Sequence, residues 1–92
     1  MRLILFLSFC LLVSSCDKRP ATWTAFVYPI EGSEDGETIR TGLVSEKVCL
    51  DMAGRMVSDL KSSGFESAYF KCGYRCAYEP ERKTHVCKTI VK

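Results

Sequence analysis

The chain has 92 residues, of which 47% are hydrophobic and six are cysteines, and its formal net charge is +2 at pH 7. This length allows one small domain, whose core is too thin to be very stable unaided. So small a net charge gives no electrostatic reason to expect a nucleic-acid partner. Six cysteines in so short a chain indicate crosslinks, metal or lipid, and the compartment decides between them.

Residues 1–15 have the pattern of an export signal rather than of a folded segment. Arg2 supplies a positive charge, and residues 3–13 form an apolar run. This run is too short to cross a membrane as a helix, which takes about 20 residues, but it fits the apolar centre of a secretory signal. We therefore expect residues 1–15 to be removed as a signal peptide.

The segment LVSSC, residues 12–16, resembles the lipobox of bacterial lipoproteins, in which an aliphatic and two small residues precede a cysteine. The resemblance implies attachment of diacylglycerol to the sulfur of Cys16, cleavage before Cys16 and acylation of the new amino group. Ordinary signal-peptidase cleavage at the same bond is the alternative. Cysteine parity favours lipidation, because loss of Cys10 and lipidation of Cys16 leave an even number of thiols for an oxidising compartment.

Residues 16–22 are expected to be a lipidated N-terminus and a short tether. The segment 17–22 reaches roughly 20 Å when fully extended, so the domain must lie close to the bilayer. Lys18 and Arg19 then lie at the height of the headgroups, where each basic residue adds about 1 kcal/mol on an anionic surface. Asp17 is similar to the residue that retains lipoproteins in the inner membrane of enteric bacteria. We expect a cell-envelope protein that faces the periplasm, with the inner membrane favoured.

Residues 23–92 are expected to form a single domain that begins with two strands. Thr22–Tyr28 is aromatic and β-branched and ends at a proline, which is typical of a strand. Ile30–Glu37 is rich in glycine, serine and acidic residues, which indicates a loop. Thr38–Val44 alternates apolar and polar residues, which favours a second strand that returns beside the first.

A helix is expected over about Glu46–Ser62. Ser45 is a suitable N-cap, and Gly64 followed by Phe65 provides a stop. Apolar residues recur at helical spacing and form one stripe. The stripe consists of Val48, Met52, Met56 and Leu60, flanked by Cys49, Ala53 and Val57.

Two further strands are expected over Ser67–Tyr78 and Lys83–Val91, which are rich in aromatic and β-branched residues. Pro80 occupies the favoured second position of the turn between them. The order strand-strand-helix-strand-strand predicts an α+β fold, a small antiparallel sheet with one helix on one face.

The mature domain contains the cysteines Cys49, Cys72, Cys76 and Cys87. Disulfides are the default in an exported protein, and the spacing fits neither zinc knuckles nor a thioredoxin-like motif. We favour the pairs Cys49–Cys72 and Cys76–Cys87, with the second pair lying diagonally across the last hairpin. The swap Cys49–Cys76 with Cys72–Cys87 stays open. Each bond closes a loop worth about 3 kcal/mol in the chain-entropy model.

Other residues give no pattern typical of a catalytic, metal or cofactor site. Glu31–Glu37 concentrates four carboxylates but lacks the alternating order of a calcium loop, so a solvated loop is favoured. His85 is the only histidine, and no phosphate loop or pair of catalytic carboxylates is found. We therefore expect neither an enzyme nor a cofactor. A periplasmic thiol-redox or other enzymatic accessory using Cys72 and Cys76, or His85, is the alternative.

Aromatic residues are concentrated in the expected strands. Phe26 and Tyr28 share one face of the first strand, while Trp23 favours the other. Since one helix covers only one face, Trp23, Phe26, Tyr28 and Tyr74 are candidates for an interaction face that binds a protein or a glycan. Cross-strand aromatic pairing that only stabilises the sheet is the alternative.

The segments WTAFVYP, residues 23–29, and CGYRC, residues 72–76, resemble motifs of a group of short exported proteobacterial proteins of unknown function. These proteins share W-T-x-F-V-Y-P and C-G-x-x-C followed by a last cysteine. The resemblance implies a shared disulfide-linked fold and no activity. We expect a membrane-anchored lipoprotein that acts as a small binding or interaction module for an envelope protein.

Overall fold

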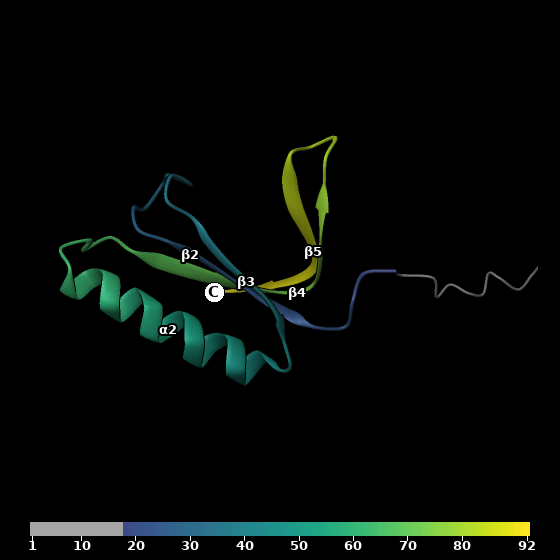
Figure 1. Ribbon diagram of the computed structural model, residues 1–92, viewed down its shortest axis with the longest axis horizontal. Helices are drawn as coiled ribbons and strands as arrows, with labels where there is room; N and C mark the ends of the chain where they lie inside the picture. The colour runs from purple at the N-terminus through teal and green to yellow at the C-terminus, as the bar shows by residue number, and fades with distance from the viewer. Residues whose placement is uncertain (1–17) are drawn as a thin grey trace, which may run out of the picture.

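The computed structural model describes residues 18–92 (Figure 1). The expected signal peptide, the lipidation site Cys16 and Asp17 lie outside the described residues. The elements follow the order β2 (Trp23–Tyr28), β3 (Thr38–Leu43), α2 (Glu46–Ser62), β4 (Tyr69–Glu79) and β5 (Thr84–Val91). This order confirms the predicted α+β fold. Within residues 18–92, no helix has the length and apolar character needed to cross a membrane.

The four strands form one antiparallel sheet in the order β3-β2-β4-β5. β3 returns beside β2 as predicted, and β4 pairs along the other edge of β2, with Trp23 opposite Tyr74 and Tyr28 opposite Tyr69. β2 is therefore a central strand. Five of its six residues are buried, because neighbouring elements cover both of its faces.

The helix α2 begins and ends at the residues that the sequence predicts. The hydroxyl of Ser45 accepts a hydrogen bond of 3.1 Å from an amide of the first turn. At the other end, the Phe65 N–H donates to the carbonyl of Leu60 at 3.0 Å, and the Gly64 N–H donates to that of Lys61 at 3.1 Å. This is a Schellman motif, which requires the left-handed backbone that Gly64 adopts with φ of 104°.

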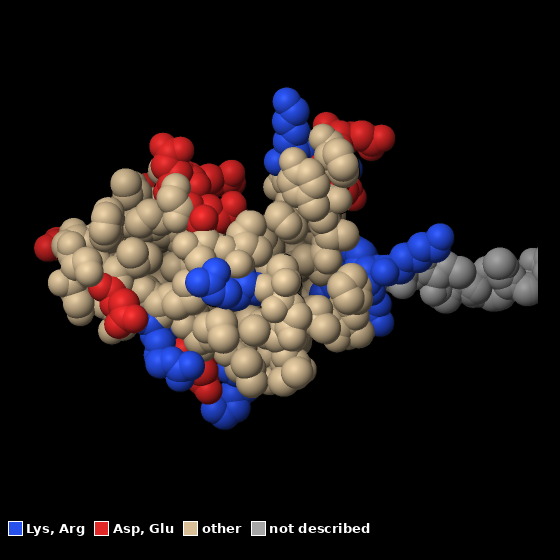
Figure 2. Space-filling model, in the orientation of Figure 1, with Lys and Arg blue, Asp and Glu red and all other residues tan. Residues whose placement is uncertain are grey.

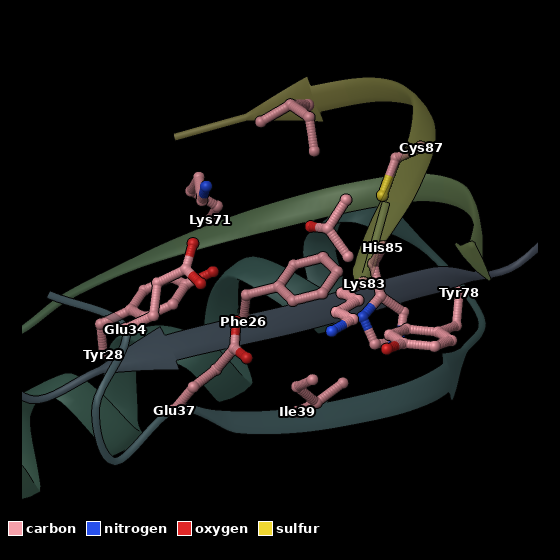
Figure 3. A pocket seen from close by; sticks show the side chains of 12 residues that line it. Phe26, Tyr28, Glu34, Glu37, Ile39, Lys71, Tyr78, Lys83, His85 and Cys87 are labelled. Carbon is pink, nitrogen blue, oxygen red and sulfur yellow. The ribbon is translucent and has the colours of Figure 1, made fainter. Parts of the chain in front are cut away.

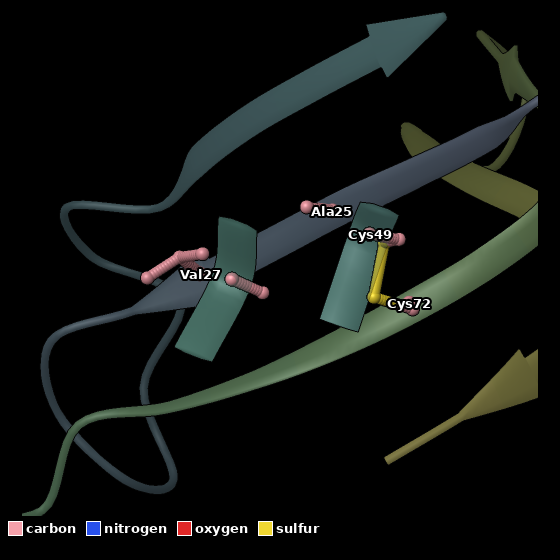
Figure 4. Close-up of a cluster of buried hydrophobic side chains, with 5 residues drawn as sticks. Ala25, Val27, Cys49 and Cys72 are labelled. Atoms are coloured by element: carbon pink, nitrogen blue, oxygen red, sulfur yellow. A yellow bond between two sulfur atoms is a disulfide. The ribbon is translucent and has the colours of Figure 1, made fainter. Parts of the chain in front are cut away.

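The core lies between α2 and the sheet and consists of small side chains (Figure 4). Cys49 and Ala53 are the fully buried helical residues, whereas Val48 is 37% exposed. The buried stripe is therefore centred beside the predicted one, on the residues that allow the closest approach of helix and sheet. The disulfide Cys49–Cys72 joins α2 to β4 across this core. The buried apolar residues of the core are Ala25, Val27, Cys49, Ala53 and Cys72.

The hairpin of β4 and β5 bends away from the plane of the sheet, on the side opposite α2 (Figure 1). Arg75 adopts a left-handed backbone with φ of 53° at this bend, which an L-residue in a regular strand does not do. Cys76 lies directly opposite Cys87 in the hairpin. The diagonal arrangement that the sequence suggested is therefore wrong. The disulfide between these two cysteines confirms the favoured pairing.

The Cys76–Cys87 disulfide packs directly on Gly73. A Cβ atom at position 73 would lie 2.5 Å from the sulfur of Cys87 and 2.6 Å from that of Cys76. Only glycine leaves room for these sulfurs, so Gly73 marks a close approach within a strand. The disulfide thereby joins the two strands of the bent hairpin beside Gly73.

Candidate functional site

A cavity of about 270 Å³ lies between the sheet and the bent hairpin, on the face opposite α2 (Figure 3). Phe26 and Tyr28 project into it from β2 because alternate residues of a strand share a face. Ile39 of β3 lies opposite Phe26 in the sheet and also lines the cavity. The hairpin contributes Tyr78 and His85 from above. The rest of the lining comprises Glu34, Glu37, Lys71, Lys83, Thr84, Cys87 and Ile90.

Ring contacts seat the hairpin on the sheet. The ring of His85 lies 5.6 Å from that of Phe26 and 5.2 Å from that of Tyr78, edge to face in both cases. These are favourable geometries for aromatic pairs. The contacts leave Phe26 only 4% exposed although no helix covers it. Tyr78 stays 53% exposed, so it presents an aromatic surface to solvent at the mouth of the cavity.

Tyr28 forms the other end of the cavity floor and is 3% exposed. Its ring stacks on that of Tyr69 at 4.7 Å, and the ammonium of Lys71 lies 5.4 Å from its ring centre. Burial, a hydrogen bond to the carboxylate of Glu37 and the nearby negative charge of Glu34 raise the pKa of the Tyr28 hydroxyl. The hydroxyl therefore stays protonated and serves as a donor to Glu37.

The cavity carries charges of both signs. Glu34 and Glu37 come from the loop between β2 and β3, Lys71 comes from β4, and Lys83 comes from the tip of the hairpin. Figure 3 shows the two carboxylates beside Tyr28 and Phe26, with the lysines on the other elements. Aromatic rings with charges of both signs suit a ligand that has an apolar group and polar groups of either charge.

The four residues of the expected interaction face are divided between two places. Phe26 and Tyr28 line the cavity. Trp23 packs against the core under α2, and the ring of Tyr74 lies 5.2 Å from it. Trp23 and Tyr74 thus form a separate aromatic pair near the start of β2.

The cysteines are paired on opposite sides of the sheet. Cys72 is fully buried and bonded to Cys49, whereas Cys76 is bonded to Cys87, which lines the cavity. A Cys72–Cys76 bond, which a thiol-redox accessory would cycle, is therefore not formed. Within residues 18–92, no group of three or more histidine, cysteine or acidic side chains has an arrangement that could hold a metal ion.

Sequence reasoning did not place Lys71, Lys83, Glu34 and Glu37 at one site. The composition of the acidic loop favours a solvated loop, and the lysines carry no motif. Gly73 provided a usable signal, because a glycine inside a strand often marks close approach of another segment. Such an approach brings the hairpin over the sheet, and with it the hairpin residues that line the cavity.

No protein-family model matches the chain, and no curated protein or solved structure is significantly similar to it. The function is therefore inferred from the geometry of the cavity, the disulfides and the sequence pattern that precedes the domain.

Proposed function

We propose that the protein is a membrane-anchored lipoprotein of the cell envelope and a small binding module that takes a segment of an envelope protein into its cavity. The cavity between the sheet and the bent hairpin carries this proposal. It faces away from α2 and is lined by aromatic side chains. A disulfide joins the two strands of the hairpin that forms its upper wall, and the ring of His85 seats that hairpin on Phe26. A preformed site of this kind binds with little loss of conformational entropy.

The chemistry of the lining favours a polypeptide as the occupant. A protein segment supplies apolar side chains for Phe26 and Tyr78, and it carries cations and anions for the carboxylates and lysines of the rim. Tyrosine and other aromatic residues are enriched at protein interfaces, where they act as anchors. The ring of Tyr78 is exposed and therefore accessible to such a partner.

The proposed location in the envelope is supported by the cysteines and by the sequence before the domain. Two disulfides are the state expected in an oxidising compartment. The lipobox-like segment 12–16 supplies the anchor, with the lipid on Cys16, and the domain then faces the periplasm. Asp17 favours the inner membrane.

Photo-crosslinking in cells tests the binding site. A photoreactive phenylalanine analogue at position 78 should give a discrete adduct with an envelope protein, whereas the analogue at Arg55 on α2 should not. Lys83→Glu should weaken the adduct, because Lys83 lines the cavity. Arg82→Glu makes the same charge change beside it and is the matched control. Equal adducts from positions 78 and 55 would refute the cavity as the binding site.

Metabolic labelling with a fatty-acid analogue tests the anchor. The label should be incorporated into the wild-type protein and lost in Cys16→Ala, and labelling that survives this substitution refutes the anchor. Thiol quantification on the exported protein tests the thiol-redox alternative. We expect no free thiol in the domain, and a readily cycling pair would favour the alternative.

A further inference from the structure

Arg75 holds the tether against the bend of the hairpin. Its backbone N–H donates to the carbonyl of Thr22 at 3.0 Å, and its guanidinium Nη1 donates to the carbonyl of Arg19 at 2.6 Å. The chain is therefore attached to the domain from Arg19 onward, and residues 19–22 do not extend away from it as a free linker.

This attachment shortens the distance between the lipid anchor and the domain. Only Asp17 and Lys18 lie between Cys16 and Arg19. Three Cα–Cα steps reach about 11 Å at full extension, and the whole tether would reach roughly 20 Å if it were free. The headgroup region on each side of a bilayer is itself about 5–8 Å thick. With a lipid on Cys16, the end of the domain that contains Arg75 must lie against the headgroups.

The side chains at this end suit that environment. The paired rings of Trp23 and Tyr74 lie there, and the guanidinium of Arg75 is 5.7 Å from the centre of the Tyr74 ring. Val44, which follows the residue paired with Trp23, is 82% exposed. Tryptophan and tyrosine favour the membrane interface, where an apolar ring and a polar group are both accommodated.

Basic side chains lie beside the tether. Figure 2 shows Lys and Arg where the described chain begins and a cluster of acidic side chains over the far part of the sheet, while both signs also occur along α2 and at the hairpin tip. The acidic loop 31–37 belongs to the opposite end of β2. Basic residues near the anchor are attracted to anionic lipids, and an acidic loop is repelled by them.

We propose that Trp23, Val44, Tyr74 and Arg75 form a membrane-contacting surface, and that Arg75 presses this surface onto an anionic bilayer by holding the tether. The inference rests on the proposed anchor at Cys16. It gives the domain a fixed orientation, in which the bend of the hairpin lies at the membrane and the acidic loop lies away from it.

Trp23 is the only tryptophan of the chain, and its half-buried ring pairs with Tyr74, so its fluorescence reports on this end of the domain. The acylated protein would be inserted into vesicles of phosphatidylethanolamine and phosphatidylglycerol that contain lipids brominated near the glycerol. We expect strong quenching of Trp23 by the bromine atoms. Arg75→Gly keeps the left-handed backbone but removes the guanidinium that holds the Arg19 carbonyl, so quenching should fall at least about twofold as the reach grows from about 11 Å towards about 20 Å.

Arg82→Gly removes the same charge at the hairpin tip and should leave quenching unchanged. Val44→Asp places a charge at the exposed valine and should also weaken quenching without altering the core. An intact-mass measurement on the same sample determines whether the protein is acylated. An acylated protein with unquenched Trp23, or equal quenching in wild type and Arg75→Gly, overturns the membrane-contacting surface while the anchor stands. An unacylated protein overturns the anchor and the surface together.

Discussion

The two faces of the sheet are covered by different means. On the face under α2, the fully buried side chains are small and uncharged and allow a close approach, with Trp23 and Phe70 partly buried against them. The Cys49–Cys72 disulfide is fully buried there. On the other face, large aromatic side chains lie beneath the sheet's own hairpin, together with two carboxylates and two lysines. The first face contains the fully buried core, while the second face carries the cavity that we propose as the binding site. Changes to either face should therefore alter the free energy of unfolding, and only changes to the second face should also alter the proposed binding.

Removal of the buried disulfide should have the largest effect. Cys49→Ala with Cys72→Ala deletes the crosslink between α2 and β4 and should lower the free energy of unfolding by about 3 kcal/mol or more. In so small a domain we expect loss of cooperative thermal unfolding. Cys76→Ala with Cys87→Ala is the matched control. Its shorter loop should make it about 0.7 kcal/mol less costly, and a larger cost would contradict the division between the faces.

Gly73→Ala should have the next largest effect, on the cavity side. The new Cβ would collide with both sulfurs of the Cys76–Cys87 disulfide, and the forced shift should cost about 2 kcal/mol in urea unfolding. The same substitution in the Cys76→Ala, Cys87→Ala background should cost clearly less. A double-mutant cycle with no coupling energy would show that the disulfide does not pack on Gly73.

Tyr28→Phe should cost about 1.5 kcal/mol, because it removes a hydrogen bond to a carboxylate at the cavity floor. The effect should depend on pH. The pKa of Tyr28 in the folded protein is raised above its ordinary value of 10.0. The contribution of Tyr28 to the free energy of unfolding is therefore complete below pH 10.0. Above it, the unfolded chain loses the proton that the folded protein keeps, and stability falls as pH rises.

Melting temperatures measured at about pH 9 and about pH 11 check this sign, since the ordinary tyrosine pKa lies between these values. Tyr28→Phe should lose less stability over this interval than the wild type. Tyr69→Phe, which alters the ring stacked on Tyr28, is the control and should follow the wild type. The same slope in wild type and Tyr28→Phe would contradict the proposed hydrogen bond.

Ser45→Ala should have the smallest effect and should act on the helix face alone. It removes the acceptor for the first-turn amide of α2 and should cost about 1 kcal/mol, whereas Ser45→Gly should cost only a few tenths. Thermal unfolding measures both variants. Crosslinking from position 78 should be unchanged in either, and a loss of the adduct would show that the two faces are coupled.

Local signals in the sequence predicted the elements well. The cap at Ser45, the stop at Gly64 and the apolar spacing determine α2 by interactions within a few residues, so its bounds are confirmed. The favoured disulfide pairs are also confirmed, since the expected helix and last hairpin restrict which cysteines meet. The central position of β2 was not predicted, because pairing of β2 with β4 joins segments distant in sequence.

The candidate site was predicted only in part. Alternation placed Phe26 and Tyr28 on one face, and both line the cavity. The upper wall depends on the left-handed backbone of Arg75, and arginine carries no local signal for that conformation. The cavity therefore arises from a tertiary arrangement that local patterns do not specify.

The strand order also constrains how the molecule assembles. Neither disulfide includes a residue of β2 or β3, so the central strand is held only by pairing and packing. β2 is synthesised early, yet it pairs with β4, whose last residue is Glu79. The sheet cannot be completed until β4 and β5 have been synthesised. Closing so long a loop is slow, and oxidation of the cysteines can join α2, β4 and β5 before β2 takes its place.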